Sequence, residues 1–266
     1  MRKDICFYVS SPYSYKDIFD VYYQTFQKFA AKSSIPLVLS TNYDAIYEGI
    51  QIISSDDIND SWVTRSIDAL KQIKTKYVLL SCDDMFLINE FLDNEIFHIV
   101  DVMDKLNINF CRLKPRKKGV QVSGEDYLIY EYQSIPYAKN LQIGIFNREY
   151  LLNVLGDGKL SAWDIEANWL KESYLAKNIP FKDVICVSKP ILKIVHAVDK
   201  GKLYPSAIKE IKRIGLDINT EREVMPVIRE LKLHIYGLWG TLLPKKSRYI
   251  LKRILSKIGF KFTTEY

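Results

Sequence analysis

Hydrophobic residues form two kinds of pattern along most of this chain. Short continuous apolar runs predict buried strands, and longer segments with an apolar residue every three or four positions predict helices. The runs place strands at 5–9, 37–39, 49–53, 77–80, 110–113, 127–132 and 141–146, and around Ile185 and Ile191; the periodic segments place helices at 17–31, 62–74, 89–106, 148–155 and 161–178. This alternation predicts an α/β fold with an open, mostly parallel sheet flanked by helices.

The chain is organised around the stretch YVLLSCDDMF, residues 77–86. Two adjacent carboxylates, Asp83 and Asp84, follow the apolar run directly. In open α/β sheets, ligands bind beyond the carboxyl ends of the strands. Two neighbouring carboxylates repel each other unless a cation lies between them, and oxygen ligands favour Mg²⁺ or Mn²⁺ over zinc. The sequence therefore predicts a metal and ligand site here; the alternative is that the acids only cap the next helix.

Two other segments are expected at the same edge of the sheet. Ser10 and Ser11 end the first strand and begin a polar loop that we expect to bind ligand. Asp60 or Ser61 is expected to cap the helix that carries Arg65. Arg65 either points toward a phosphate or toward Asp83, or is a plain surface arginine.

Later motifs are less specific. The segment 114–124 is basic and is expected to be an exposed, mobile loop that either closes over an anionic ligand or is only solvated. Gly144, inside an expected strand, predicts close approach by a ligand or another backbone. Ser161 and Asp164 have the spacing of a capping box. Asp164 and Glu166 do not share a helical face, so at most one of them is expected to enter a given pocket.

Composition limits the class of protein. The 266 residues suit one large domain, or one domain with a small appendage, and 48% hydrophobic content is enough for a sizeable core. Four widely spaced cysteines without a CxxC pair indicate reduced thiols rather than zinc or a disulfide framework. Neither a signal peptide nor a membrane-spanning run is found, so the expected location is the cytoplasm or the inner face of the cell membrane.

Four stretches, FYVSSPYSY, WVTRSIDAL, YVLLSCDDMF and SAWDIE, together with the tail IVHAVDKGKLYP, span most of residues 5–205. With them the chain resembles bacterial glycosyltransferases of the GT-A fold, particularly those of capsule and lipopolysaccharide assembly. That family's usual pattern is Asp-any-Asp, whereas Cys82 occupies the first position here. The resemblance implies transfer of a sugar from a nucleoside diphosphate to an acceptor hydroxyl, with Mn²⁺ or Mg²⁺ stabilising the diphosphate.

The resemblance also implies roles for individual residues. Asp84 and His196 would bind the metal, and Asp83 would bind the ribose or sugar hydroxyls of the donor. Lys200 and Lys202, on either side of Gly201, would neutralise the diphosphate.

For an inverting transfer, the resemblance implies a carboxylate base at the start of a helix beyond the donor site. Asp164 matches that position best, and Glu166 is its rival; both remain open to the alternative of an ordinary helix cap. Trp163 would stack on the acceptor or donor sugar, or belong to the core. A retaining enzyme would not need the base.

The C-terminal segment has a separate pattern. We divide the chain into a catalytic domain, 1–222, and a basic helical segment, 223–266. In this segment an apolar stripe at 250–258 is flanked by lysines and arginines, as in helices that lie on an anionic membrane surface. Such a helix would bring the enzyme to a lipid-linked acceptor. The alternative is a terminal helix packed on the domain; the basic residues lack a nucleic-acid recognition motif.

Two other functions remain open at this stage. One is a nucleotidyltransferase or phosphotransferase, although the segment SSPYSY lacks the glycines of a phosphate-binding loop. The other is a non-catalytic, membrane-peripheral assembly factor that keeps a degenerate sugar-nucleotide fold.

Overall fold

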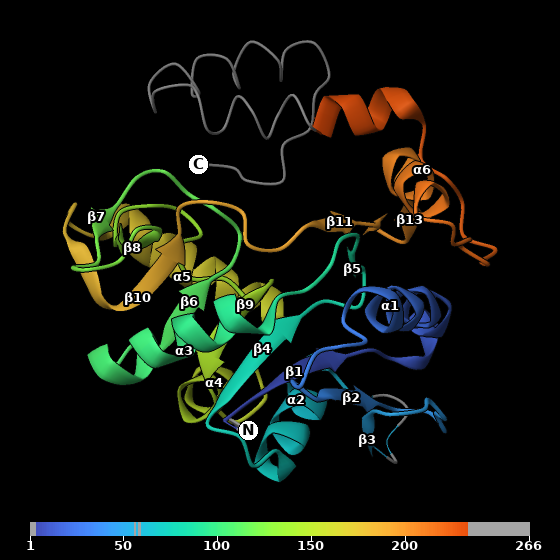
Figure 1. The fold of residues 1–266 in the computed structure, drawn as a ribbon, viewed down its shortest axis with the longest axis horizontal. Coiled ribbons are helices and arrows are strands. Elements are labelled where there is room, and N and C mark those ends of the chain that lie inside the picture. Colours follow the sequence, from blue (N-terminus) through green and yellow to red (C-terminus); the bar gives the residue numbers. More distant parts are fainter. Residues whose placement is uncertain (1–3, 56, 58–59, 234–266) are drawn as a thin grey trace.

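The structure is a computed structural model that describes residues 4–55, 57 and 60–233. Its elements alternate between strands and helices up to the acid pair, as predicted (Figure 1). The elements in chain order are β1 (Ile5–Ser10), η1 (Tyr13–Tyr15), α1 (Lys16–Phe29), β2 (Leu37–Thr41), β3 (Gln51–Ser54), α2 (Trp62–Gln72), β4 (Tyr77–Ser81), β5 (Met85–Leu87), α3 (Asp93–Leu106), β6 (Phe110–Arg112), β7 (Val120–Gln121), β8 (Leu128–Tyr132), β9 (Gly144–Asn147), α4 (Arg148–Leu155), α5 (Ala162–Leu175), β10 (Pro180–Val187), β11 (Ile194–His196), β12 (Val198–Asp199), β13 (Lys202–Leu203) and α6 (Pro205–Arg213).

The main sheet has nine strands within the described residues, in the order β3-β2-β1-β4-β9-β6-β10-β8-β7. β8 and β9 are antiparallel to their neighbours, so the other seven strands run in one direction. The predicted open, mostly parallel α/β sheet is therefore confirmed. The chain builds outward from β1 to β2 and β3, and then returns to place β4 on the other side of β1. This reversal makes a switch point between β1 and β4, where such sheets bind ligands.

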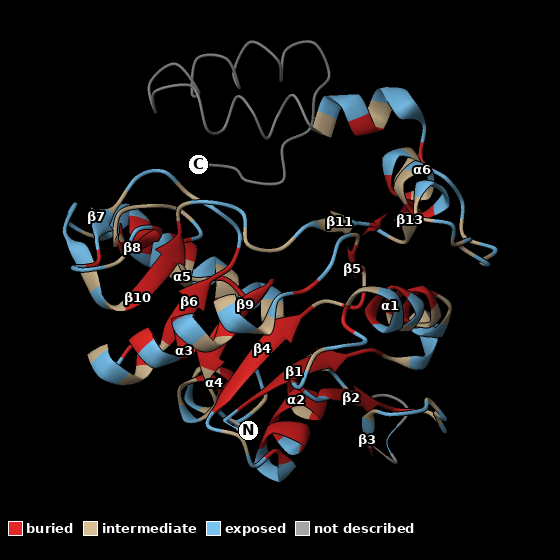
Figure 2. Cartoon of the chain, in the orientation of Figure 1, coloured by how far each residue is buried: buried red, intermediate tan, exposed pale blue. Residues whose placement is uncertain are grey.

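Two hydrophobic cores cover the two faces of the sheet. Side chains of β1 and β4 alternate between them, with Phe7 and Leu79 on one face and Tyr8 and Leu80 on the other. α1 and α3 pack on the first face, and α2, α4 and α5 pack on the second. Figure 2 shows the central strands buried and the outward sides of the helices exposed. The switch point therefore lies on a rigid three-layer framework.

A two-stranded sheet of β5 and β11 stands apart from the main sheet. β5 follows the acid pair directly, so the alternative that Asp83 and Asp84 cap a helix is wrong: a turn and a strand come next, and α3 begins only at Asp93. β11 begins at Ile194 rather than around Ile191. The pairing returns a distant part of the chain to the acids.

Residues 205–226 differ from the sequence-based expectation. Pro205 begins α6 at its first turn, in a segment for which the sequence analysis predicted no helix. Residues 223–226 were expected to be helical, but Val224 makes a parallel β-bridge with Leu203. Within the described part of this segment, 223–233, the helix begins at residue 227. The apolar stripe at 250–258 lies outside the described residues.

The segment 114–124 is also held more firmly than expected. Arg116 N–H donates to Val187 O (3.0 Å) and its side chain lies against the buried Glu131 (3.1 Å), while β7 pairs with β8. At Gly144 the close approach is made by the ring of Phe110 and by the backbone carbonyl oxygen of Cys111, as predicted for close approach by another backbone. Among the described residues, no helix has the length and apolar character needed to cross a bilayer.

Candidate functional site

The acid pair lies at the carboxyl end of β4, beside the end of β1. Asp83 and Asp84 occupy the turn that connects β4 to β5. This is the switch point of the sheet, so the backbone itself brings the loop after β1 and the acids together. Ser10 ends β1, and Ser11 follows it.

A cavity of about 660 Å³ opens at this place. That volume falls in the range of small-molecule sites, roughly 300–1,000 Å³. The walls come from the loop and η1 after β1, the end of β2, the start of α2 and the turn after β4. The lining residues are Ser10, Pro12, Tyr13, Ser14, Tyr15, Asn42, Asp60, Trp62, Arg65, Cys82, Asp83 and Asp84. Four residues that we singled out from sequence for the site, Ser10, Arg65, Asp83 and Asp84, thus share one cavity.

Asp83 is buried and accepts a hydrogen bond from the hydroxyl of Ser11 (2.7 Å). Burial, with the charge of Asp84 beside it, raises the pKa of Asp83 to about 7. The Ser11 hydroxyl opposes this rise because it stabilises the ionised form. Ser11 therefore fixes the orientation of Asp83.

Asp84 and His196 meet although 112 positions separate them in the sequence: His196 Nε2 lies 2.9 Å from Asp84 Oδ2. The antiparallel pairing of β5 with β11 places them, and Ala197 N–H donates to Asp84 O (2.8 Å). The structure thus brings the two predicted metal ligands into contact. The side chain of His196 is half exposed, so this pair lies at the solvent side of the acid turn.

The residues here fit a cation that arrives with a phosphorylated ligand. No group of three or more His, Cys, Asp or Glu side chains suited to a metal is found among the described residues. Mg²⁺ commonly uses only one or two carboxylates and completes its shell with substrate phosphates and water. Asp84 supplies one such carboxylate and His196 adds an imidazole nitrogen, so most of the shell would come from substrate phosphates and water, whereas a structural zinc site would need four protein ligands.

Arg65 is buried, so the alternative of a plain surface arginine is wrong. Ser61 caps α2 in a capping box with Thr64, which leaves the side chain of Asp60 available to Arg65. The guanidinium donates from Nε to the hydroxyl of Ser10 (2.9 Å) and from Nη1 to Asp60 Oδ1. Arg65 thus joins the end of β1 to the start of α2.

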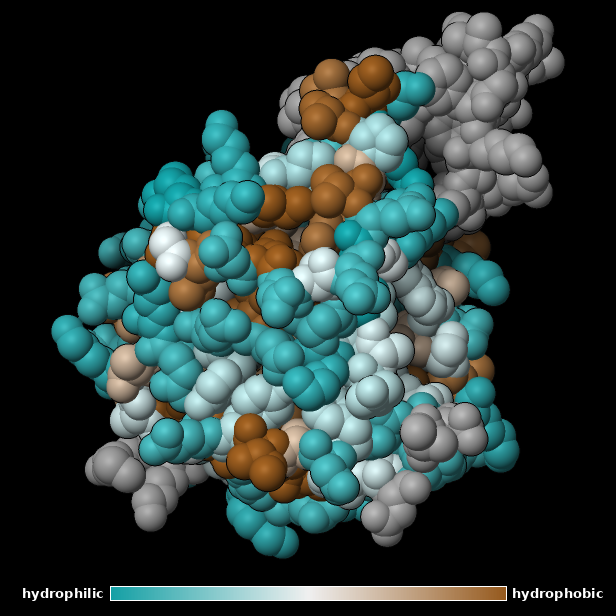
Figure 3. Space-filling model, turned by 90° about the vertical axis from the view of Figure 1, so that its right-hand side faces the viewer, coloured by the Kyte–Doolittle hydropathy of each residue, from teal (hydrophilic) through white to brown (hydrophobic). Residues whose placement is uncertain are grey.

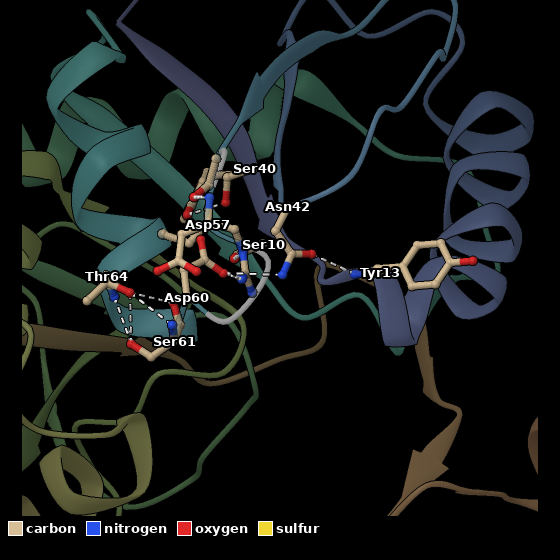
Figure 4. Close-up of polar contacts among 11 residues, drawn as sticks. Ser10, Tyr13, Ser40, Asn42, Asp57, Asp60, Ser61 and Thr64 are labelled. Atoms are coloured by element: carbon tan, nitrogen blue, oxygen red, sulfur yellow. Dashed lines mark hydrogen bonds and ion pairs between the residues drawn. The ribbon is translucent and has the colours of Figure 1, made fainter.

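Sequence reasoning missed a polar network on the same wall (Figure 4). Tyr13 N–H donates to Asn42 Oδ1 (2.8 Å), and Asn42 Nδ2 donates to Asp60 Oδ1 (3.4 Å). Asp60 Oδ2 is buried, and no described residue hydrogen-bonds to it. Tyr13 takes part through its backbone at the start of η1, and the side chains of Asn42 and Asp60 come from the loops after β2 and before α2. Their sequence signals are those of ordinary turn residues, so no spacing rule could have grouped them.

Arg222 was also missed. It donates from Nε to Asp17 Oδ2 (2.7 Å) and from Nη2 to Asp17 Oδ1 (2.9 Å), and its guanidinium carbon lies 4.2 Å from the centre of the Tyr15 ring. Burial raises the pKa of Tyr15, Arg222 opposes this rise, and the charges of Asp83 and Asp84 add to it. Arg222 therefore packs against Tyr15, which lines the cavity.

The two candidate bases lie in different surroundings. Asp164 is exposed and closes the capping box of α5, accepting from the hydroxyl (2.6 Å) and the N–H (3.0 Å) of Ser161, which hold its pKa below the usual range. Glu166 is half-buried and accepts from Leu141 N–H (2.7 Å); burial raises its pKa. Burial raises the pKa of Cys82, next to the acid pair, and the charges of Asp84, Asp83 and Glu166 add to this rise. Neither residue lines the cavity of about 660 Å³, and Glu166 is the more buried of the two.

Trp163 and the two lysines stand away from the cavity lining. Trp163 is 81% exposed at the start of α5, so it does not belong to the core. Lys200 and Gly201, both with positive φ, form the two-residue turn between β12 and β13. Lys202 pairs with Glu223. Lys200 thus lies in the turn of the β12–β13 hairpin and Lys202 in its second strand, and neither lines the cavity.

No family model matches this sequence, and no curated protein matches it either. Solved structures with a related arrangement include S. aureus TarS residues 1–349 with UDP (13% identity; 85% of this chain and 68% of that chain; TM-score 0.47). Others are the mannosyltransferase PcManGT from Pyrobaculum calidifontis with GDP-Man and Mn²⁺ (12%; 98% and 82%; 0.47) and CMP:2-keto-3-deoxy-manno-octonic acid synthetase with CTP (10%; 80% and 98%; 0.48). The chain spans 59% of another TarS 1–349 structure and 41% of the longer TarS chain. At these values the likeness is one of general arrangement only.

Proposed function

We propose that this chain is a metal-dependent glycosyltransferase that uses a nucleoside-diphosphate sugar as donor. The observation that carries the proposal is the contact of His196 with Asp84, which lines a cavity at the switch point of the sheet. The sequence resemblance to GT-A enzymes supports the same reading.

The charge of the cavity supports a need for a cation. Its described lining contains three carboxylates, Asp60, Asp83 and Asp84, and Arg65 is the cation among them. The guanidinium of Arg65 is already bonded to Asp60 and Ser10. A diphosphate would therefore meet excess negative charge unless a divalent ion accompanied it.

In this proposal Asp84 and His196 hold the ion, and Asp83, oriented by Ser11, accepts hydrogen bonds from donor hydroxyls. Bound Mn²⁺ or Mg²⁺ would stabilise the negative charge that develops on the departing diphosphate. Glu166 takes the proton of the acceptor hydroxyl if the transfer is inverting, because its burial raises its proton affinity toward the working pH. Trp163, exposed near Glu166 in the sequence, offers its ring to the acceptor sugar.

The finer assignments rest on the sequence alone. We propose a lipid-linked precursor of a bacterial surface polysaccharide as acceptor, with the enzyme in the cytoplasm on the inner face of the membrane. The basic residues of 223–266 support this location.

A nucleotidyltransferase or phosphotransferase is the second candidate, because an acid pair with a metal also serves phosphate chemistry. Against it, the loop after β1 contains Pro12 and the short helix η1 instead of a glycine-rich phosphate cradle.

Product analysis tests the proposal. The purified chain is incubated with Mn²⁺ and a panel of nucleotide sugars, in parallel with Asp84→Ala and with Asp157→Ala, whose carboxylate is exposed and pairs with Lys159. Release of nucleoside diphosphate by the wild type and Asp157→Ala, but not by Asp84→Ala, would support glycosyl transfer. In a parallel incubation with nucleoside triphosphates and sugar 1-phosphates, release of pyrophosphate with formation of a nucleotide sugar would favour the nucleotidyltransferase. No turnover of any donor and no binding of any nucleotide would favour a non-catalytic assembly factor.

A further inference from the structure

The helix at 227–233 has its polar and apolar sides reversed. Its apolar residues Val227, Ile228 and Leu231 are 67%, 70% and 57% exposed, and Val224 just before it is 51% exposed. Its residue Glu230 is buried and accepts from Ser206 N–H (3.3 Å) and from the Ser206 hydroxyl. A surface helix ordinarily turns its apolar side to the core and its charges to water.

Val224, Val227, Ile228 and Leu231 are called here the apolar face. Backbone contacts fix it on the body of the protein: Leu203 N–H donates to Glu223 O (2.9 Å), Met225 N–H donates to Leu203 O (2.9 Å), and Met225 is buried. Figure 3 shows hydrophobic residues gathered high on this side of the molecule, at the level of α6 and of the helix at 227–233. The face is therefore held in place and open to a partner.

Charge indicates which partner. Residues 234–266 contain seven of the 38 basic residues and one of the 32 acidic residues, so residues 1–233 contain 31 of each. The net charge of +6 thus belongs wholly to the chain that continues from the apolar face. Val224, at the start of the face, lines a hollow of about 440 Å³ together with Lys212, Arg222 and Asp217. An apolar patch that is followed in the sequence by a strongly basic segment matches a surface that is apolar inside and anionic outside.

We propose that the apolar face docks on an anionic lipid bilayer, with Val227, Ile228 and Leu231 inserted among the lipids and Lys212 and Lys232 at the level of the head groups. A second copy of the chain fits less well because it would bring the same positive charge to the contact. Nothing in this inference depends on the donor or on the proposed reaction.

Docking there would also set the distance of the active site from the membrane. The segment 194–231 contains both the apolar face and His196, whose strand β11 pairs with β5 beside the acids. α6 and the helix at 227–233 lie on the β11 side of the main sheet (Figure 1). A bilayer bound to this face would therefore lie on the side of the sheet where His196 meets Asp84.

Vesicle co-sedimentation of the full chain tests the proposal. The variant Val227→Ser/Ile228→Ser/Leu231→Ser is compared with a control, Leu175→Ser/Ile179→Ser, whose apolar residues are also exposed, at 89% and 49%. Vesicles are phosphatidylcholine alone or mixed with phosphatidylglycerol. We expect the wild type and the control to bind the mixed vesicles, and the triple variant to bind them at least about tenfold more weakly, because three side chains lose their apolar burial.

Two further measurements keep the result interpretable. Circular dichroism and the melting temperature should be unchanged in the triple variant, since the replaced side chains are exposed in the free protein. Charge reversal by Lys212→Glu should weaken binding, whereas Lys71→Glu on α2 should not. Equal binding of mixed vesicles by the wild type and the triple variant would overturn the proposal. A dimeric wild type that binds no vesicles, with a monomeric triple variant, would overturn it in favour of self-association.

Discussion

The buried pair of Arg65 and Asp60 makes a quantitative test of how the cavity wall is held. Their side chains are 3% and 6% exposed, and Arg65 Nη1 donates to Asp60 Oδ1. Replacing Arg65 by Met keeps the length of the side chain but leaves Asp60 with one long hydrogen bond from Asn42 (3.4 Å), because Asp60 Oδ2 has no bond from a described residue. An ionised carboxylate would then be buried without a counter-charge.

Breaking a buried pair in this way costs about 3–5 kcal/mol. At about 2–4 °C per kcal/mol for a chain of this size, Arg65→Met should lower the melting temperature by about 6–20 °C. The double variant Arg65→Met/Asp60→Leu removes both charges, so it should recover most of this loss. Arg213→Met, which breaks the exposed pair with Glu210, should cost less than about 1 kcal/mol.

The assay is urea unfolding followed by circular dichroism. Wild type, Arg65→Met, Asp60→Leu and the double variant form a double-mutant cycle, and Arg213→Met is a fifth protein that serves as the surface control. The coupling energy between Arg65 and Asp60 should exceed about 2 kcal/mol. A loss below about 1 kcal/mol in Arg65→Met, equal to that of the Arg213 control, would refute the reasoning. The wall would then be held by other contacts.

Two further predictions concern catalysis and packing. Glu166→Gln should lower the transfer rate by about 10²–10⁴-fold, whereas Asp164→Asn should leave it within a few-fold, and equal losses in both variants would contradict the assignment. Because burial raises the pKa of Glu166, the acid limb of the pH–rate profile should lie above the ordinary glutamate range. Gly144→Ala should destabilise the fold by about 1–3 kcal/mol because its Cβ meets the ring of Phe110, which is stacked on Phe146 in the core, and unchanged denaturant unfolding would contradict that packing.

Much of the fold could be predicted from the sequence because its signals are local. Continuous apolar runs marked β1, β2 and β4, and three-to-four-residue periodicity marked the buried sides of α1, α2 and α3. β5 was missed because three residues give too short a run to read. α6 was missed because Pro205 and the many polar residues resemble a loop, although Pro is favoured at the first helical position.

The site was only partly predictable because its contacts join distant segments. Asp83 and Asp84 were found since they follow a strand directly. Their neighbours are set by tertiary structure: Arg222 lies 205 positions from Asp17, with which it pairs. The proposal of Glu166 rather than Asp164 as the base uses burial, which the sequence does not give.

The central claim is that a divalent ion held by Asp84 and His196 joins the protein to the diphosphate of the donor. Calorimetric titration of the wild type with UDP, GDP, CDP and ADP, each with Mn²⁺ and with excess chelator, measures this link directly. The account predicts that at least one nucleotide binds at least about tenfold more tightly with Mn²⁺, and that Asp84→Asn loses this gain while its unfolding is unchanged. Equal affinity with and without Mn²⁺, or an undiminished Mn²⁺ effect in Asp84→Asn, would contradict it.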